Sequence, residues 1–405
     1  MRGLIEDFHA VLQRRLRPGA TTPLAVGFSG GGDSLALLRL TLDWAAARGR
    51  PVLALTVDHG LNPASQGWTA DALAKARDLG ADARALRWTG DKPATGLSAA
   101  ARAARHALLA TAAREAGARV LLLGHTADDR LEAARMRAEG STTSDPRQWA
   151  PSPAWPEGRS VFLLRPLLAV RRQALRDWLT ERGETWLEDP ANADLGSARA
   201  RARAALASED PAVPPIPLDP SPPLAVEGEH ALRLPRDASA AQVAAACLCA
   251  AGTTAPPRGD RLERLVTRLR SGDAFTATLA GARIVADAAG ALFVREAGEG
   301  GRGGLAPLTL AAGETGVWDG RYEITAQAAI AIRALAGLAR RLPADETAAL
   351  KRFPAPVRPV LPGAIDAAGA ISSPILAGDR AIRARVLIRE RFEAATGFID
   401  QEPAT

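Results

Sequence analysis

Residues 24–34 read LAVGFSGGGDS, a short apolar run that leads into a glycine-rich loop and the start of a helical pattern. Glycines let the backbone turn tightly and approach an anion, and a new helix offers free N–H groups and the positive end of its dipole. The order strand, glycine loop, helix therefore predicts a phosphate-binding turn. An ordinary glycine-rich connection between a strand and a helix is the competing interpretation.

The end of this loop differs from a Walker A motif, because the G-K-[ST] sequence is missing and Asp33 stands in place of the lysine. An acidic side chain beside a phosphate cradle is suited to holding Mg²⁺. Asp33 is therefore a candidate metal ligand, and the hydroxyls of Ser29 and Ser34 are candidate donors to a phosphate.

Outward from the loop, short apolar strands alternate with helical patterns through the first half of the chain. We expect strands at 24–28, 52–57, 84–88, 119–123 and 163–167, and helices at 5–16, 33–48, 65–79, 97–116, from 127, and 170–183. Such alternation predicts an α/β fold with a doubly wound parallel sheet that helices cover on both faces.

The second half of the chain has a different pattern. The segment 211–224 is rich in proline, which predicts a stiff linker between a domain at 1–210 and a C-terminal region at 225–405. We expect 238–272 to be helical and 273–330 to be rich in strands, with turns at 289–290 and 319–320, which predicts a smaller α+β region. The sequence GEGGRGG at 298–304 is expected to be a flexible link and a candidate point of division within this region.

Composition limits the class of protein. A chain of 405 residues with 47 % hydrophobic residues is long enough for two or three domains with full cores. Two cysteines exclude a disulfide scaffold and a four-cysteine metal site, and no apolar run is long enough to span a membrane. With no signal-peptide pattern at the start, we expect a cytoplasmic protein without membrane partners.

The cations are almost all arginine, and the formal net charge is +6. One interpretation is a bias in amino-acid composition, and the other is affinity for a polyanion such as nucleic acid, because arginine pairs well with phosphate. The arginines at 258, 261, 264, 268 and 270 recur at roughly helical spacing, which is typical either of a basic stripe or of a solvated helix face.

Polar residues follow two further strands. VDHGL at 57–61 places Asp58 and His59 at the end of the second strand, and GHTADDRLE at 124–132 follows a later one. Ligands of an open parallel sheet lie beyond the carboxyl ends of its strands, so these groups should converge on the loop at 28–34. Asp129 and Glu132 are three residues apart and share a helix face, which suits a metal, a cationic substrate or a general base. Simple helix capping is the alternative for each acidic group.

The SGGGDS string resembles the loop of the PP-loop ATP pyrophosphatases, which cleave ATP between its α- and β-phosphates. VDHGL, the R-x-x-R pair at 102 and 105, GHTADDRLE, RPLL at 165–168, WLEDPAN at 186–192 and the arginines at 199 and 203 narrow the resemblance to the tRNA(Ile)-lysidine synthetase family. The resemblance is strong over about 20–205 and weaker beyond. Departures from the family pattern are His106, Arg130, Ala133 and Ala200.

The resemblance implies a ligase that adenylates the C2 oxygen of the wobble cytidine in tRNA(Ile) with a CAU anticodon and then joins L-lysine to C2, forming lysidine. It implies ATP and Mg²⁺ as cofactors. Asp33, Asp129 and Glu132 would be catalytic, with Asp33 as the tentative Mg²⁺ ligand. The implied substrate-binding residues are Asp129, Glu132, Arg199 and Arg203. The ATP-binding residues would be Ser29, Gly30, Gly31, Gly32, Asp33, Ser34, Asp58, His59, Arg105, Gly124 and His125.

Two other functions fit parts of the sequence. A tRNA thiolase would carry sulfur on cysteine or a cluster, but Cys247 and Cys249 lie two apart on a predicted helix and point to different sides, which favours packing. A non-catalytic RNA-binding protein is less consistent with intact acidic residues at 33, 129 and 132. Trp149 and Trp155, within the long connection at 141–160, are candidates either for stacking on an anticodon base or for packing the connection onto its domain.

Overall fold

A computed structural model describes residues 2–141, 143–188, 198–206, 211–216, 228–376 and 381–404. The chain divides into two compact units, one formed by Met1–Pro220 with Ile399–Thr405 and the other by Ser221–Phe398. Of the predicted linker at 211–224, only 211–216 are described, and residues 189–192 of the WLEDPAN motif also lie outside the described residues.

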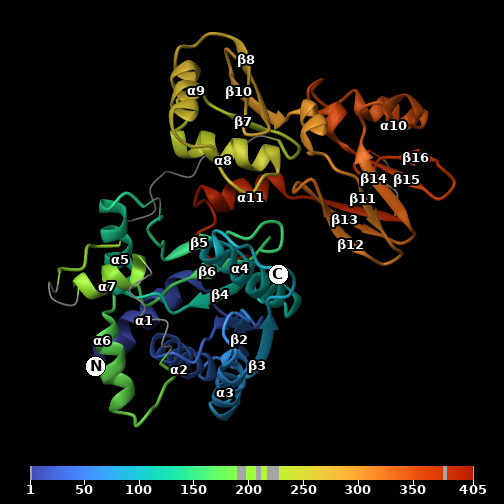
Figure 1. The fold of residues 1–405 in the computed structure, drawn as a ribbon. Coiled ribbons are helices and arrows are strands. Elements are labelled where there is room, and N and C mark those ends of the chain that lie inside the picture. Colours follow the sequence, from blue (N-terminus) through green and yellow to red (C-terminus); the bar gives the residue numbers. More distant parts are fainter. Residues whose placement is uncertain are drawn as a thin grey trace. The chain divides into compact units, whose positions relative to one another are not determined.

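The first unit is built on one six-stranded sheet whose strand order is β3-β2-β1-β4-β6-β5 (Figure 1). Its strands are β1 (Leu24–Gly27), β2 (Val52–Asp58), β3 (Asp82–Arg87), β4 (Val120–Leu123), β5 (Trp149–Pro151) and β6 (Phe162–Leu164). Its helices are α1 (Arg2–Arg15), α2 (Gly32–Ala46), α3 (Ser65–Asp78), α4 (Leu97–Glu115), α5 (Ala127–Ala138), α6 (Arg172–Thr180) and α7 (Ala198–Leu206). The expected α/β alternation is confirmed.

Parallel pairing aligns the carboxyl ends of the central strands. Gly27 of β1 lies opposite Leu55 of β2 on one side and opposite Leu123 of β4 on the other. The chain moves from β1 outward to β2 and β3, then returns to β4 on the other side of β1. This reversal is a topological switch point, and it places the loops after β1 and β4 side by side.

Apolar residues on both faces of the strands hold the helices in place. Alternate side chains of a strand point to opposite faces, so Ala25, Leu53 and Leu121 share one face. There they pack against Leu109 and Ala113 of α4 in a fully buried cluster. The remaining strand residues are equally buried, which explains the continuous apolar runs in the sequence.

The connection at 141–160 contains an element that the sequence analysis did not expect. Residues 149–151 form β5, which runs antiparallel to β6 at the edge of the sheet. The Trp149 ring stacks on Phe162 at 4.8 Å between centroids, and its indole N–H donates to the Ile399 carbonyl at 2.8 Å. Of the two alternatives for Trp149, the structure therefore confirms packing of the segment onto the domain, because the ring is already covered.

The second unit combines three antiparallel sheets with short helices. Its strands are β7 (Leu232–Leu234), β8 (Phe275–Leu279), β9 (Ala282–Asp287), β10 (Gly290–Arg295), β11 (Leu308–Leu310), β12 (Thr315–Trp318), β13 (Tyr322–Ala326), β14 (Ile330–Ala334), β15 (Pro362–Asp366), β16 (Ile371–Ser372) and β17 (Ile382–Val386). Its helices are α8 (Ala240–Ala251), α9 (Asp260–Arg270), α10 (Ala344–Leu350) and α11 (Ile388–Ala395), with 3₁₀ turns η2 (Ala297–Arg302), η3 (Ala339–Arg341) and η4 (Arg358–Val360). The sheets are ordered β7-β10-β9-β8, β11-β14-β15-β16 and β12-β13-β17.

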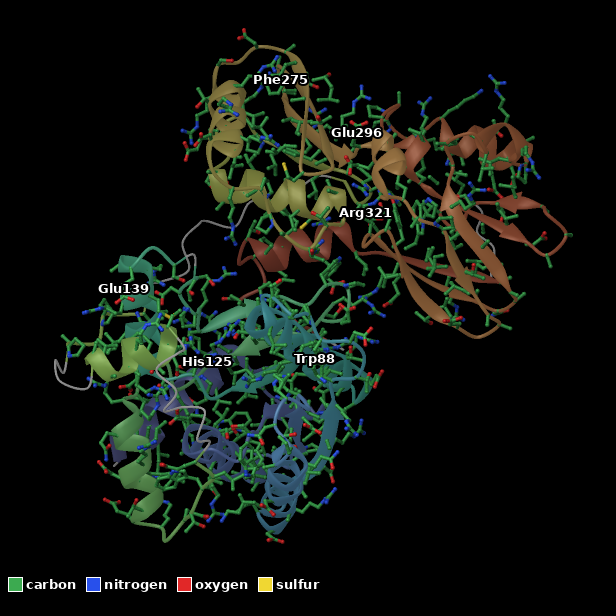
Figure 2. The ribbon with its side chains drawn as sticks, viewed as in Figure 1. Trp88, His125, Glu139, Phe275, Glu296 and Arg321 are labelled. Atoms are coloured by element: carbon green, nitrogen blue, oxygen red, sulfur yellow. The ribbon has the colours of Figure 1, made fainter. Side chains whose placement is uncertain are left out.

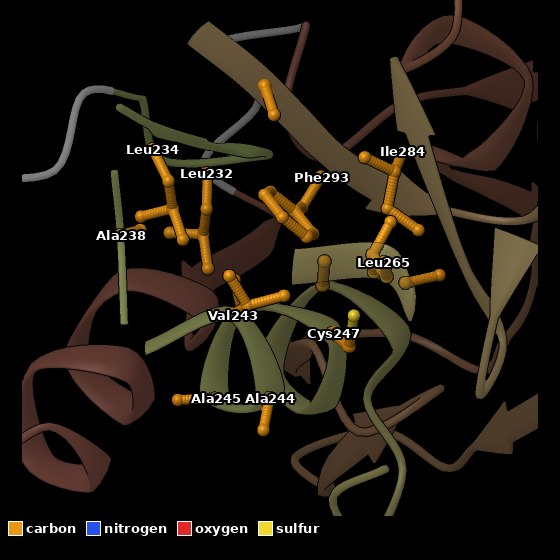
Figure 3. Close-up of a cluster of buried hydrophobic side chains, with 14 of the residues drawn as sticks. Leu232, Leu234, Ala238, Val243, Ala244, Ala245, Cys247, Leu265, Ile284 and Phe293 are labelled. Carbon is orange, nitrogen blue, oxygen red and sulfur yellow. The ribbon is translucent and has the colours of Figure 1, made fainter. Parts of the chain in front are cut away.

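One buried cluster of this unit packs α8 and α9 against the sheet of β7 to β10, around Phe293, Ile284 and Val243 (Figure 3). Cys247 and Cys249 belong to this core, and burial raises the pKa of both thiols to about 12. The packing interpretation of the cysteines is confirmed.

The flexible link expected at 298–304 is not observed. Residues 297–302 form the 3₁₀ turn η2, whose first turn the Glu296 side chain caps by accepting from the Gly298 N–H at 3.0 Å. Gly303 adopts φ of 85°, which favours glycine, and the next N–H, that of Gly304, bonds back to the Glu299 carbonyl at 3.0 Å. Local hydrogen bonding therefore gives this glycine-rich stretch a defined turn.

Residues 399–404 return to the first unit and insert an acidic side chain. Glu402 accepts from Arg50 Nη1 at 2.9 Å and forms a second hydrogen bond with Nη2 of the same guanidinium. The backbone N–H of Arg17 also donates to it at 3.1 Å, and the Thr22 hydroxyl at 3.2 Å. Because the side chains of Arg50 and Glu402 are 2 % and 1 % exposed, each charge depends on the other for compensation.

We expect Glu402→Ala to lower the free energy of unfolding of the first unit by about 3–5 kcal/mol, since it leaves the Arg50 guanidinium buried without its partner. Urea denaturation followed by tryptophan fluorescence would measure this. The control is Glu139→Ala, which removes an exposed partner of Arg135 and should cost under about 1 kcal/mol. Equal losses in both variants would contradict the assigned role of the buried pair.

Candidate active site

The loop after β1 is held by its own serines and by the segment at 186–187. Ser34 Oγ donates to the Gly31 carbonyl at 2.8 Å and accepts from the Ser29 N–H at 3.2 Å. Gly30 has φ of 83°, and a Cβ there would lie 2.6 Å from a methyl of Leu187. The Leu187 N–H also bonds to the Gly30 carbonyl at 3.0 Å. Part of the WLEDPAN motif therefore closes against the glycine loop.

The loop after β4 approaches the same place. A Cβ on Gly124 would lie 3.0 Å from the Asp33 carbonyl oxygen and 3.3 Å from the Ser34 Cα. Only glycine permits this distance without a shift of the backbone. The structure thus brings together Gly124 and the loop at 28–34, as the switch-point argument predicts.

Asp58 and His59 lie at the end of β2, but they differ in their surroundings. The Asp58 carboxylate accepts from the Gly60 N–H at 2.8 Å and holds the turn that follows the strand. Burial by itself would raise the pKa of Asp58, but hydrogen bonds from Ser65 and Gly60 outweigh burial and lower it. His59 is half-buried and meets the edge of the Trp88 ring at 6.2 Å between centroids.

A cavity of about 190 Å³ lies over the carboxyl ends of β2 and β4. Its lining is basic and aromatic, and consists of His59, Ala101, Arg102, Arg105, His106, Leu123 and His125. The structure therefore brings the predicted ATP-binding residues His59, Arg105 and His125 to one cavity. His125 and the neighbouring Trp88 are labelled in Figure 2.

Three histidines of this lining keep a buried ring nitrogen without a hydrogen bond among the described residues, namely Nδ1 of His59, His106 and His125. Burial lowers the pKa of His106 and of His125 to about 3, so both rings are neutral at pH 7 and each Nδ1 is available to a ligand. A polar lining with unused groups is typical of a site for a polar ligand.

Asp129 and Glu132 share one face of α5, as the three-residue spacing predicts. Asp129 Oδ2 accepts from the Thr126 N–H at 2.8 Å and from the Thr126 hydroxyl at 3.0 Å, which completes a capping box. Burial by itself would raise the pKa of Asp129, but nearby donors and cations outweigh burial and lower it. The capping interpretation therefore holds for Asp129, and the same contacts fix its carboxylate in the site.

Arg172 was missed by the sequence analysis, and it occupies the centre of the acidic residues. Its Nε donates to Asp33 Oδ2 at 3.0 Å and its Nη1 to Glu132 Oε1 at 3.2 Å, while Nη2 lies 3.7 Å from Asp129 Oδ2. Burial by itself would lower the pKa of Arg172, but the three carboxylates outweigh it and raise that pKa. One guanidinium thus joins the carboxylate of the phosphate loop to the pair on α5.

A local contact sets the position of Arg172. Asp128 Oδ2 accepts from the Arg172 backbone N–H at 2.6 Å, and Arg171 Nε donates to the other oxygen at 3.2 Å. Asp128 therefore caps α6 from α5, and Arg172 as the first residue of α6 is directed at Glu132. The only signal in the sequence is the pair Arg171-Arg172 at the start of an amphipathic helix. That pattern does not show which of the two arginines enters the acidic cluster.

The predicted substrate-binding arginines also reach this cluster. Arg203 Nε donates to Glu132 Oε1 at 2.8 Å, and Arg199 lies 3.7 Å from Asp129 and 3.5 Å from Glu132. Both come from α7, which packs on α5. Both arginines, which were predicted to bind substrate, thus lie beside Asp129 and Glu132.

Two of the departures from the family pattern have a structural reason. Arg130 points away from the acidic cluster and donates to the carbonyls of Pro214 and Pro215 at 2.7 and 2.8 Å, which pins the segment 211–216 to α5. Ala200 is buried in α7. Neither position adds a charge to the cluster of Asp33, Asp129 and Glu132.

The described residues suit Mg²⁺ only as an ion shared between one carboxylate and the phosphates of a substrate. The described part of the chain holds no group of three or more acidic, histidine or cysteine side chains that could bind a metal. Asp33 is a single carboxylate at the first turn of α2, beside the glycine loop. Mg²⁺ commonly binds through one or two carboxylates and the phosphates of a substrate, and Asp33 fits that arrangement.

The predicted basic stripe lies on α9 of the second unit. Arg261, Arg264 and Arg268 line a cavity of about 770 Å³ beside the turn between β8 and β9, and Arg268 covers the Phe275 ring at 4.2 Å. The leucines at 262, 265 and 269 fill the opposite, buried face of the helix. The leucine face of α9 therefore belongs to the core, and the arginine face forms a basic surface.

Comparisons with known proteins show the family to which this chain is similar. Residues 5–210 match the PP-loop domain family. The tRNA(Ile)-lysidine synthase of Caulobacter vibrioides is 57 % identical over 99 % of this chain and 100 % of its own length. That of Hyphomonas neptunium is 38 % identical over 65 % of this chain and 79 % of its own. Among solved structures, a U34-tRNA thiolase from Methanococcus maripaludis covers 51 % of this chain at 17 % identity with a TM-score of 0.42, a likeness too weak to inform function.

His106 provides a test of the buried, neutral imidazoles. Its pKa of about 3 in the folded protein lies below the ordinary value of 6.5, so the unfolded chain binds the proton first as the pH falls. The stabilisation is complete above pH 6.5 and is lost as the pH falls toward 3. We expect His106→Phe to reduce the slope of unfolding free energy between pH 6 and 5 by up to about 1.4 kcal/mol per pH unit. Identical slopes for the variant and the parent protein, measured by urea denaturation, would rule out a buried neutral His106.

Proposed function

The chain belongs to the tRNA(Ile)-lysidine synthase family, and from this we propose that it joins lysine to the wobble cytidine of an isoleucine tRNA while cleaving ATP to AMP and pyrophosphate. The observation that carries the proposal is the convergence of a phosphate-binding loop and a carboxylate pair at one edge of the sheet, joined through Arg172. The match of residues 5–210 to the PP-loop domain supports the use of ATP.

In the first step, the C2 oxygen of the cytosine attacks the α-phosphorus of ATP, and the bond to the β-phosphate oxygen breaks to release pyrophosphate. The loop at 29–34 offers the N–H groups of the first turn of α2 and the hydroxyls of Ser29 and Ser34 to the departing phosphates. Mg²⁺ held by Asp33 and those phosphates would offset the negative charge of the leaving group.

The basic cavity lies next to this loop and suits the rest of the nucleotide. Arg105 and the neutral His59 and His125 provide donors and flat rings at the ends of β2 and β4. We assign these three residues to ATP, together with Gly124, whose lack of a side chain brings the two loops together. The Asp58 carboxylate supports this region by holding the turn that carries His59.

In the second step, the lysine amine attacks C2, and the bond between C2 and the oxygen of AMP breaks. An ammonium cannot attack until it loses a proton, and a carboxylate can both bind the cation and accept that proton. We assign this work to Asp129 and Glu132, because both are ionisable, both contact Arg172, and Arg172 also contacts Asp33 of the glycine-rich loop. Arg199 and Arg203 are partly exposed beside these carboxylates and would contact phosphates of tRNA or of AMP.

One further feature supports tRNA as the second substrate. The arginine surface of α9 offers three guanidinium groups beside one cavity, which suits a phosphate backbone.

The rival function, sulfur transfer, lacks support because burial raises the pKa of both cysteines to about 12, and sulfur chemistry needs the thiolate form. Within the described residues, no helix combines the length and apolar character that crossing a bilayer requires. We propose the cytoplasm as the place of this reaction.

The product identifies the reaction. Purified protein incubated with ATP, Mg²⁺, labelled lysine and tRNA(Ile) bearing a CAU anticodon should incorporate one lysine per tRNA, and nucleoside mass spectrometry should find lysidine. AMP and pyrophosphate should form in equal amounts. Release of ADP and phosphate, or incorporation of sulfur when a sulfur donor is supplied, would refute the proposal.

The two steps should separate by mutation. We expect Asp33→Asn to abolish adenylation, measured as exchange of labelled pyrophosphate into ATP in the presence of tRNA. Glu132→Gln should retain exchange but slow lysine transfer by about 10²–10⁴-fold, the usual contribution of a general base. Glu139→Gln is the matched control, because Glu139 follows the last turn of the same helix and is exposed (Figure 2). Loss of exchange in Glu132→Gln equal to that in Asp33→Asn would disprove the division of roles.

A further inference from the structure

The segment 184–187, which follows α6, lies directly on the glycine-rich loop. A Cβ on Gly30 would lie 2.6 Å from a methyl of Leu187, and a Cβ on Gly32 would lie 3.4 Å from the Trp186 ring. The Leu187 N–H donates to the Gly30 carbonyl at 3.0 Å. Two glycines of the loop thus leave room for side chains of this segment, so the shape of the loop depends on where the segment lies.

The Glu184 carboxylate anchors the beginning of this segment. Lys75 Nζ of α3 donates to Glu184 Oε2 at 2.5 Å, and Arg39 Nη2 of α2 lies 2.9 Å from Oε1. The Glu184 side chain is 8 % exposed, whereas both cations are 34 % exposed. A carboxylate this buried depends on its cations to compensate its charge. Glu184 therefore joins segment 184–187 to the two helices that follow β1 and β2.

This anchor lies away from the place where the loop meets phosphates. Arg39 comes seven residues after Gly32 in α2, which is about 10 Å along the helix axis. Both carboxylate oxygens of Glu184 are taken by the cations of α2 and α3. Glu184 therefore acts on the loop through segment 184–187 and not by contact with a phosphate.

We propose that Glu184 is a positioning residue for ATP. It holds segment 184–187 against the glycine-rich loop, and the segment keeps the loop in the shape that receives the phosphates. This inference rests on the proposed function, in which that loop binds the phosphates of ATP. A loop that is competent in only a fraction of the molecules binds its ligand more weakly by that fraction. Loss of the anchor therefore weakens the binding of ATP and leaves the amine site unchanged.

The test compares ATP binding with the use of lysine. Equilibrium dialysis with labelled α,β-methylene-ATP and Mg²⁺ measures the first, and lysidine formation at saturating ATP and tRNA gives the KM for lysine. We expect Glu184→Gln, which removes the charge and keeps the shape, to weaken binding of the analogue about five- to tenfold. The KM for lysine should not change, because Asp129 and Glu132 keep their own contacts.

Lys75→Met tests the same anchor from its other side. It should weaken binding of the analogue in the parent protein but cause no further loss in the Glu184→Gln protein, since both changes break one interaction. A further loss in the double variant would show that Lys75 acts on ATP directly and would overturn the assignment. Because Lys75 is partly exposed, this variant also keeps the proposal testable if Glu184→Gln is unstable.

Glu181→Gln is the matched control, because Glu181 is exposed at the end of α6 and should leave binding of the analogue unchanged. Thermal melts verify that each variant is folded. Unchanged binding in folded Glu184→Gln protein, or an equal rise in the Kd for the analogue and the KM for lysine, would contradict a positioning role. A parent protein that binds the analogue but forms no lysidine would instead refute the proposed function itself.

Discussion

The guanidinium of Arg172 lies between carboxylates that belong to two different helices, and the arrangement of the candidate site depends on this one charge. Asp33 lies in the first turn of α2, while Asp129 and Glu132 lie on α5. Three like charges near one point repel each other unless a cation is shared among them. The guanidinium supplies that cation with three nitrogens in one plane, so the phosphate loop and the carboxylate pair keep a fixed relation.

This arrangement is possible because the sheet brings its loops together. The strand ends at Gly27 and Leu123 are in register, and Gly124 lets the second loop touch the backbone of the first. A larger residue at Gly124 would press on the backbone of Asp33 and Ser34 and force one of the two loops to shift. The close approach of the loops therefore depends on a residue that has no side chain.

Arginine has two kinds of role in this protein, and the amino-acid composition does not distinguish them. Of the numerous arginines, some are structural: Arg50 holds Glu402 in the first unit, and Arg130 holds the segment 211–216. Others line a surface cavity, as on the basic face of α9. Arginine suits both roles because a guanidinium can donate to carbonyls and carboxylates inside the protein as well as to phosphates outside it.

The sequence by itself determined the alternation of β1 to β4 and β6 with α1 to α6, the place of the glycine-rich loop and the positions of the acidic residues, because apolar periodicity and glycine are local signals. It did not predict β5 or α7. It also indicated that Cys247 and Cys249 pack in a core, since their spacing is a property of one helix. Tertiary structure alone decided that Arg172 joins the acidic residues and that residues 149–151 form an edge strand whose Trp149 stacks on Phe162. Both outcomes depend on groups far apart in the chain, and a pattern of neighbouring residues does not record them.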